Sequence, residues 1–338
     1  MAHDKLNIII PMAGYGTRLR PHTWSKPKPL VCTAGNAVIG HVLDLVNTVF
    51  EPEETEVACI IGYYGEQVME YMQSHYPKTK THYYFQREML GQSHAIAMAR
   101  QQLHGPTLIM FVDTIIDSDL SFLRREKTDA VIWVKEVEDP RSFGVVELDD
   151  DGLVKNLIEK PDTMENNLAV VGYYYFSQGE QLMAAIDRQI QEKITTKGEY
   201  YLANAISLML DDGLQMRPQV VDVWLDTGLP ETILSTNRYL LENGLASHPP
   251  QEKMKNVQIT PPVFIHPLAE VSDSHIGPHA SVGRSCKVTG SHIEDSVLEP
   301  KAEVHNAHLV NSIIGARACI DGLKGSFNIG DDSHVKGI

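Results

Sequence analysis

Short apolar runs alternate with amphipathic segments over the first 245 residues of the chain. The continuous aliphatic and aromatic runs predict buried strands at residues 6–12, 56–62, 82–86, 107–113 and 130–137. Residues 38–50 and 65–76 place apolar side chains at helical spacing. Strands separated by such helices predict an α/β fold, with a mostly parallel, Rossmann-like sheet flanked by helices. Ligands of these folds bind beyond the carboxyl ends of the strands.

From residue 257 onward the pattern becomes a short repeat. An aliphatic residue returns at about every fifth or sixth position, as in other hexapeptide repeats. These residues are Ile265, Val271, Ile276, Val282, Val288, Ile293, Val304, Leu309, Ile314, Ile320, Ile329 and Val335. Three such units close one coil of a parallel β-helix, about 18 residues long, with the aliphatic side chains inside. We therefore predict a small β-helix of about four coils, with a structural or oligomer-forming role.

The stretch at residues 246–256 is polar and contains prolines, which predicts a linker. The expected domains are therefore residues 1–245 and residues 257–338.

Composition narrows the class of protein. The 338 residues include 29 Lys plus Arg and 44 Asp plus Glu, a formal charge of −15. That charge argues against nucleic acid or an anionic membrane as a partner. The four cysteines form no CxxC pair, and the apolar run at residues 6–12 is too short to span a bilayer. We expect a cytoplasmic protein.

The predicted first strand leads into the most informative stretch, MAGYGTRLRPHTWSKPKPL. Gly14 and Gly16 allow the backbone to curl so that several N–H groups converge on an anion. Four cations follow, each able to bind phosphate: Arg18, Arg20, Lys26 and Lys28. The sequence lacks the third glycine of a dinucleotide fingerprint and the GKS or GKT of a Walker loop. The alternative is a solvated basic face.

AGYGTRLRP followed by KPKPL resembles the signature of the sugar-1-phosphate nucleotidyltransferases. Five more segments resemble motifs of that family in the same order: QREMLGQSHAIAMA, LIMFVD, FGVVELDDDGLVKNLIEKP, NNLAVVGYYYF and VWLDTG. The resemblance implies that an NTP and a sugar 1-phosphate react to give an NDP-sugar and pyrophosphate. It also implies that the β-helix is left-handed.

The resemblance assigns a role to each matched residue. The catalytic residues would be Arg18, Lys28, Asp113 and Lys160. The nucleotide would contact Met12, Ala13, Gly14, Tyr15, Gly16, Thr17, Gln86, Gly91 and Gln92. The sugar phosphate would contact Gly144, Glu159, Lys160, Val171 and Gly172. Lys26 is the rival of Lys28, and is otherwise expected to be a solvated surface lysine.

Two carboxylates are matched to the metal site of the family. Asp113 and Asp226 each end an apolar run, and together they would hold one Mg²⁺ with phosphates and waters. One departure stands out, because Val112 occupies a position where the family normally has glycine. Its side chain could crowd the nucleotide.

Several alternatives remain open at this point. Gln86 with Gly91 at this spacing resembles uridylyl- and thymidylyltransferases more than guanylyltransferases. The resemblance therefore implies UTP or dTTP as the nucleotide, and glucose 1-phosphate is the favoured sugar. Two other interpretations remain. The protein could be a mannose-1-phosphate guanylyltransferase, or a regulatory homologue that binds nucleotide sugars without turnover. Six histidines lie in the repeat region without an unambiguous metal-binding pair, and an acetyltransferase role, as in β-helix relatives that use histidine, is the less favoured interpretation of them. We expect a homo-oligomer formed through the β-helix.

Overall fold

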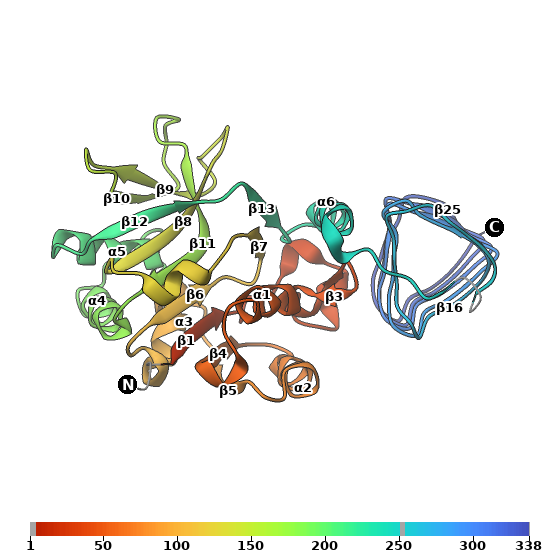
Figure 1. Ribbon diagram of the computed structural model, residues 1–338, viewed down its shortest axis with the longest axis horizontal. Coiled ribbons are helices and arrows are strands. Elements are labelled where there is room, and N and C mark those ends of the chain that lie inside the picture. The colour runs from red at the N-terminus through yellow and green to blue at the C-terminus, as the bar shows by residue number, and fades with distance from the viewer. Residues whose placement is uncertain (1–4, 251–253, 338) are drawn as a thin grey trace. The chain divides into compact units, whose positions relative to one another are not determined.

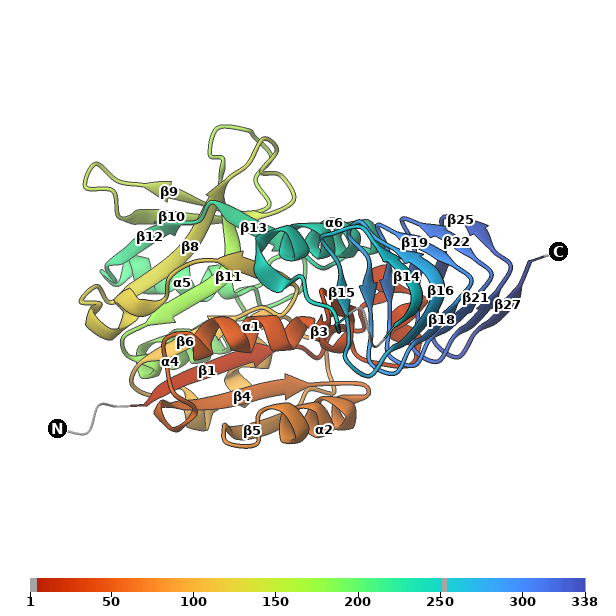
Figure 2. The same cartoon turned by 45° about the vertical axis from the view of Figure 1, so that its right-hand side comes forward.

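The computed structural model describes residues 5–250 and 254–337, and Figures 1 and 2 show two views of it. Its contacts divide the chain into two compact units. Unit 1 runs up to Gly14 and continues from Val42 to Trp224, and unit 2 comprises Tyr15–His41 and Leu225–Ile338. This division differs from the domain boundaries at residues 245 and 257, which were inferred from the start of the hexapeptide repeat. Those boundaries stay predictions. Three residues of the expected linker, 251–253, lie outside the described residues.

A mixed sheet forms the centre of unit 1 (Figure 2). Its parallel part has the order β6-β1-β4-β5, from Thr107–Met110, Leu6–Pro11, Thr55–Ile61 and Lys80–Phe85. These strands are the predicted apolar runs, and β1 and β4 are buried for nearly their whole length. The expected α/β class with a mostly parallel sheet is thereby confirmed.

A long strand, β11 (Leu168–Phe176), extends the sheet beyond β6 in the antiparallel direction. It also pairs antiparallel with β8 (Ala130–Glu136), which pairs in parallel with β12 (Met216–Val220). Its register against β8 shifts between Val170 and Tyr174, beside Gly172. The hairpin of β9 (Gly144–Leu148) and β10 (Val154–Glu159) is attached through Val145 to β11.

Helices cover this sheet because each has one apolar face. In unit 1 they are α2 (Gly65–His75), α3 (Gln92–Met98), α4 (Gly179–Gln191) and α5 (Leu202–Asp211). The buried faces of the last three join β1, β4, β6, β8 and β11 in one hydrophobic core. Helix α1 (Val38–Asn47) continues from unit 2 into unit 1. In the part of the chain that the structure describes, every helix is too short or too polar to cross a membrane.

The tail of unit 2 is a parallel β-helix, which Figure 1 shows end-on as superposed triangular coils. One face is a ladder of five strands in the order β15 (Phe264–Ile265), β17 (Ser281–Val282), β20 (Val297–Leu298), β23 (Ile313–Ile314) and β26 (Asn328–Ile329). Strand β16 (Glu270–Ile276) bends and serves the other two faces. Its first half pairs with β18 (Lys287–Thr289), and that ladder continues through β21 (Glu303–His305) and β24 (Cys319–Asp321) to β27 (His334–Lys336). Its second half lies between β14 (Lys255–Ile259) and β19 (His292–Glu294), and that ladder continues through β22 (His308–Val310) to β25 (Lys324–Gly325).

The interior of the β-helix is built from the repeated aliphatic positions, as the sequence predicts. Val271 is in register with Val288, which is followed along the ladder by Val304, Ile320 and Val335. Ala280, Cys286, Ala302 and Ala318 fill the same core as small residues. Stacked residues lie 15 to 17 positions apart, so the coils are shorter than the expected 18. The handedness stays a prediction.

Two further segments complete unit 2. Residues 15–41 contain three short 3₁₀ turns, Thr17–Leu19, His22–Trp24 and Lys28–Leu30, and a small hairpin of β2 (Cys32–Thr33) and β3 (Asn36–Ala37). Helix α6 (Pro230–Leu240) contacts both this segment and the β-helix. The side chain of Asn237 accepts the N–H of Ala34 at 2.8 Å and donates to the carbonyl of His279 at 2.9 Å.

Candidate active site

The glycine loop starts where β1 ends and runs across the division between the two units. The N–H of Met12 donates to the carbonyl of Ile60 at 2.9 Å, which continues the pairing of β1 with β4. Gly14 belongs to unit 1, whereas Tyr15 and the residues up to His41 belong to unit 2. We call residues 15–33 the cation loop, because Arg18, Lys26 and Lys28 lie on it.

Gly16 is required by the shape of the cation loop. Its φ is +59°, and a Cβ added there would lie 3.1 Å from both Lys28 Cβ and Thr23 Cγ2. Thr23 Oγ1 donates to the carbonyl of Gly16 at 2.7 Å. The backbone carrying Gly16 is therefore packed against the start of the Lys28–Leu30 turn.

Arg18 and Asp226 meet at Gly228, a residue that the sequence analysis did not single out. Both side chains belong to exposed residues. A Cβ on Gly228 would lie 3.2 Å from Arg18 Nη2 and 2.9 Å from Asp226 Oδ1. The N–H of Gly228 donates to Asp226 Oδ1 at 2.8 Å, which orients the carboxylate. The fixed offset of Gly228 from Asp226 in LDTG is the signal that could have identified it.

Lys28 and Lys26 lie in different surroundings. Lys28 is half-buried at the start of its turn. Lys26 is only 7% exposed, and its Nζ contacts Glu299 Oε2 and, at 3.2 Å, Asp331 Oδ1. The expectation of a solvated Lys26 is therefore wrong, because two carboxylates of the β-helix neutralise its charge.

The segment matched to base recognition lies in unit 1, after β5. Gln86 is 7% exposed, its N–H donates to the carbonyl of Ile61 at 2.8 Å, and its Nε2 lies 3.4 Å from His94 Nδ1. Gly91 has φ +111°, and a Cβ there would lie 2.6 Å from the backbone nitrogen of Tyr200. Gln92 Oε1 accepts the N–H of Leu202 at 3.2 Å, so this predicted nucleotide ligand also ties α3 to α5.

The segment matched to sugar binding lies on the edge hairpin, residues 143–160, which contains β9 and β10. Glu159 is in register with Gly144, where a Cβ would lie 3.1 Å from Glu159 Oε2. The next residue, Lys160, has φ +51°, and its N–H donates to the carbonyl of Phe143 at 2.9 Å. Its Nζ lies 3.8 Å from Glu159 Oε1 and 5.4 Å from the centre of the Tyr201 ring. These contacts place Gly144, Glu159 and Lys160 side by side.

The surroundings of Glu159 act on the pKa of its carboxyl group in opposite directions. Partial burial raises the pKa of this carboxyl, and the nearby cations Lys160 and Lys197 oppose that effect. The same side chain contributes to a raised pKa for Tyr174, for which burial is the larger cause. A carboxylate in this position can accept hydrogen bonds from a diol.

Asp113 follows β6, after the buried Val112, and is itself half-buried. The N–H of Phe111 donates to the carbonyl of Gly172 at 3.0 Å, which fixes the chain just before Asp113. Gly172 has φ +96° and lies where the register of β11 shifts, whereas Val171 is buried. Burial, and then the charge of Asp113, raise the pKa of Tyr173.

Comparison with known proteins decides the family. The model of a family described as nucleotidyl transferase matches residues 7–243. The chain belongs to the nucleotidyl transferase family. The prediction of this enzyme class from the glycine loop and the five later motifs is thereby confirmed.

Two relatives match this nucleotidyltransferase over nearly its whole length. A low-salt glycan biosynthesis nucleotidyltransferase, Agl11, from Haloferax volcanii is 31% identical and covers 92% of this chain and 93% of its own. A glucose-1-phosphate thymidylyltransferase from Streptomyces antibioticus is 30% identical over 92% of each chain.

A third relative matches a smaller part of the chain. A bifunctional protein GlmU from Methanocaldococcus jannaschii is 32% identical over 70% of this chain and 55% of its own.

A solved structure supports the fold. It is a crystal structure from Bacillus anthracis, described as a glucose-1-phosphate thymidylyltransferase in complex with sucrose. It aligns with this nucleotidyltransferase with a TM-score of 0.59 at 20% identity, covering 69% of this chain and 94% of its own. At this identity the match shows the fold alone.

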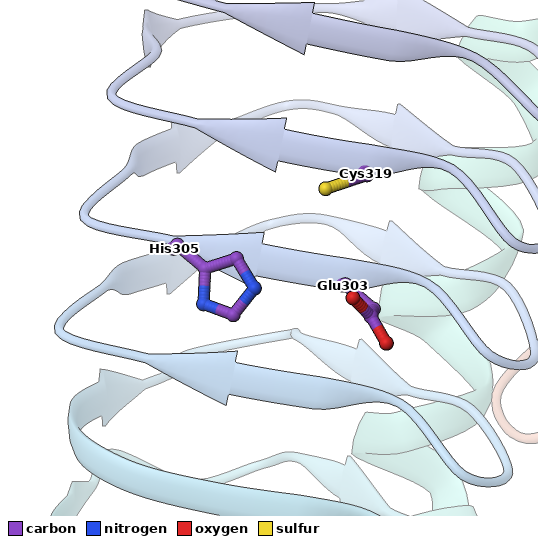
Figure 3. Close-up of side chains that lie close together, drawn as sticks. All are labelled: Glu303, His305 and Cys319. Carbon is purple, nitrogen blue, oxygen red and sulfur yellow. The ribbon is translucent and has the colours of Figure 1, made fainter.

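A separate group of side chains of the types that can ligate a metal ion lies on the outer surface of the β-helix (Figure 3). Glu303 and His305 of β21 and Cys319 of β24 bring three ligand atoms within 4.8 Å of one another. The group is not apparent in the sequence, because Cys319 reaches Glu303 only through the pairing of β21 with β24. Lys287 Nζ already lies 2.9 Å from Glu303 Oε1, so a metal ion would have to displace an ammonium. We assign it no role.

Proposed function

We propose that this nucleotidyltransferase joins an NTP, with UTP or dTTP favoured, to a sugar 1-phosphate, with glucose 1-phosphate favoured. The observation that carries the proposal is that Arg18 and Asp226 both lie against Gly228. A guanidinium next to a carboxylate can bind a metal-complexed triphosphate, because one group contacts phosphate oxygens and the other contacts the metal ion. The match to the Streptomyces antibioticus thymidylyltransferase over 92% of both chains supports the choice of substrates.

The reaction needs positioning and charge neutralisation, without a covalent intermediate on the protein. An oxygen of the sugar phosphate attacks the α-phosphorus in line, the bond from that phosphorus to the bridging oxygen breaks, and pyrophosphate leaves with the bonding electrons. Arg18 would hold the β- and γ-phosphates and stabilise the charge on the departing pyrophosphate. Lys28 would lie near the α-phosphate and the attacking group.

The edge hairpin would hold the sugar phosphate. In this proposal Lys160 binds the phosphate group and Glu159 accepts hydrogen bonds from sugar hydroxyls. The backbone at Gly144 and Gly172 would approach the sugar closely, since glycine leaves room for it. Gln86 would offer a donor and an acceptor to a pyrimidine base.

The proposed metal ligands are Asp113 and Asp226, and Mg²⁺ is the ion that we favour. Carboxylate oxygens suit a hard divalent cation, and the N–H of Gly228 already orients one oxygen of Asp226. When bound, the ion would neutralise phosphate charge and align the triphosphate. Asp113 belongs to unit 1 and Asp226 to unit 2, so shared coordination is inferred from the family and not from a distance.

Pyrophosphate release tests the proposal directly. The protein would be assayed with ATP, GTP, CTP, UTP and dTTP against glucose, galactose, mannose and N-acetylglucosamine 1-phosphates, with Mg²⁺ present. We expect turnover with UTP or dTTP and glucose 1-phosphate. Turnover confined to GTP and mannose 1-phosphate would replace this choice of substrates. The absence of turnover with every pair would favour a regulatory homologue.

We also propose that the protein forms a homo-oligomer through the β-helix. The repeat that builds this domain supports the idea, because stacked coils present flat outer faces. Sedimentation of the full chain would show a species larger than the monomer. A monomer at all concentrations would contradict the proposal.

A further inference from the structure

A buried ion network joins the cation loop to the β-helix within unit 2. Lys26 contacts Glu299 and Asp331, whose side chains are 2% and 3% exposed. Burial alone would lower the pKa of Lys26, but the two carboxylates outweigh it and the pKa is raised. The lysine therefore stays charged in a site that excludes water.

The two carboxylates also bind other groups of the cation loop. Glu299 Oε1 accepts the N–H of Cys32 at 3.0 Å. Asp331 Oδ2 accepts the hydroxyl of Ser25 at 2.6 Å, while its Oδ1 accepts the N–H of Ala316 within the β-helix at 2.8 Å. Each carboxylate therefore forms an ion pair with Lys26 and also accepts a hydrogen bond from another residue of the cation loop.

Close packing surrounds the network. His22 is fully buried, and its Nε2 contacts Asn328 Oδ1. A Cβ on Gly330 would lie 2.8 Å from Pro21 Cβ, so the β-helix approaches the loop too closely there for any side chain. The loop is thus fixed on both sides of Ser25.

The fixed part of the loop is directly connected to the proposed catalytic residues. Lys28 lies two residues after Lys26, and its carbonyl accepts the N–H of Val31 at 3.1 Å. Its Cβ lies near Gly16, which begins the turn that contains Arg18. A shift of Lys26 would therefore be passed to Lys28 along the backbone and to Arg18 through the Gly16 contact.

We propose that Lys26 is a positioning residue, through which Glu299 and Asp331 of the β-helix set the location of Lys28 and Arg18 for the reaction. This inference rests on the proposed function. Stability alone does not require such a network, because apolar residues of similar volume often replace a buried ion pair without loss. Positioning gives the network a role, since a misplacement of about 1 Å can cost about a hundredfold in rate.

The test compares Lys26→Met, Glu299→Gln and the double variant, using kcat and KM for UTP and glucose 1-phosphate together with the thermal midpoint. We expect each single variant to lower kcat by at least about tenfold, with KM for glucose 1-phosphate changed by less than about threefold. The kcat of the double variant should be no more than about threefold below that of the less active single variant, because the two residues act as one unit. A folded Lys26→Met protein with normal kcat would overturn the inference.

Two further variants keep the result interpretable. Lys287→Met removes an exposed lysine–glutamate pair on the same β-helix and should leave kcat unchanged. An equal loss in this control would show that the effect is not specific to Lys26. If a single variant does not fold, Lys26→Met/Glu299→Leu/Asp331→Asn removes the buried charges together, and unchanged kcat in that protein would equally overturn the inference.

Hydrogen exchange separates failure of this inference from failure of the proposed function. In Lys26→Met, the amides of residues 15–33 should exchange faster, while those of the edge hairpin keep their protection. Unchanged protection at residues 15–33 would reject the positioning role whatever the reaction is. If the wild type shows no turnover but the loop amides respond as expected, the proposed function fails, whereas the placement of the cation loop by the β-helix stands.

Discussion

The edge hairpin of unit 1 and the cation loop of unit 2 hold their lysines in different ways. Lys160 is 39% exposed at its side chain, and its ionic and ring partners, Glu159 and Tyr201, belong to unit 1 as well. Lys26 is nearly inaccessible, and its partners lie 273 and 305 positions away in the sequence. The hairpin can therefore change with local substitutions, whereas the loop depends on the end of the chain.

This difference changes what we expect from removal of the tail. From the sequence alone, the structural or oligomer-forming role expected for the β-helix would make deletion of residues 257–338 alter assembly more than chemistry. That deletion removes Glu299 and Asp331, which leaves the charge of Lys26 without its partners. We now expect the deletion to change the oligomeric state and also to lower the rate of turnover.

The largest effect should come from unit 2, with Asp226→Asn. If this carboxylate holds the metal ion, turnover should fall by about a hundredfold or more, roughly 3 kcal/mol of lost transition-state stabilisation. Steady-state pyrophosphate release measures it, with Asp222→Asn as a control at a nearby exposed carboxylate. Near-normal kcat/KM would remove Asp226 from the metal site.

A smaller effect is expected at the edge hairpin. Lys160→Met should raise KM for the sugar 1-phosphate by about tenfold, because one charge-assisted contact to phosphate is lost. KM for the NTP should stay within about twofold. Lys155→Met on the same hairpin removes an exposed pair with Glu147 and serves as the matched control. A similar rise in both KM values would argue against a sugar-phosphate role.

The contact of Gly91 with Tyr200 gives a prediction on stability. Gly91→Ala should lower the free energy of unfolding by about 1–3 kcal/mol, since both a positive φ and a close backbone contact oppose a side chain. Gly152→Ala shares the positive φ but has nothing within 4 Å of the added Cβ, so it should cost less. Urea denaturation compares the two, and equal losses would show that the Tyr200 contact is unimportant.

The smallest effect concerns three stacked histidines of the β-helix. Burial lowers the pKa of His292, as do the charges of His275 and His308, while Glu294 opposes them. As the pH falls, His292 therefore takes up a proton in the unfolded chain before it does so in the folded protein. Its contribution to stability is fully present above pH 6.5 and is lost as the pH falls below that value. The Tm should decrease by about 1–3 °C between pH 7 and pH 5.5. His292→Gln should flatten this dependence, and an unchanged slope would rule the histidine out.

Patterns with a short period were predicted well from the sequence. Ten of the twelve aliphatic positions predicted for the β-helix are buried, and Ile329 and Val335 near its end are partly buried against the same core. The prediction succeeds because the repeat marks the inward face of each coil. The strands of the parallel sheet were equally clear, since they are continuous apolar runs. The antiparallel insertion of β11 beside β6 was not predicted, because pairing direction leaves no local pattern when a strand is buried on both faces.

The site was predicted less completely. Gly144, Glu159 and Lys160 were named from one local block, and the structure places them together. Lys26 was misjudged because its burial depends on carboxylates encoded near the other end of the chain. Gly228 follows Asp226 in the quoted motif, but its closeness to Arg18 is a tertiary contact that the motif does not reveal.

The separation of Lys26 from Asp331 also has a consequence during synthesis. A ribosome adds about 5–20 residues per second, so roughly 15–60 s separate the two residues as they are made. During that interval the nascent lysine stays hydrated, and the cation loop cannot settle into its final arrangement. Prematurely terminated chains would therefore leave the ribosome with this loop unanchored, whatever the state of the sheet in unit 1.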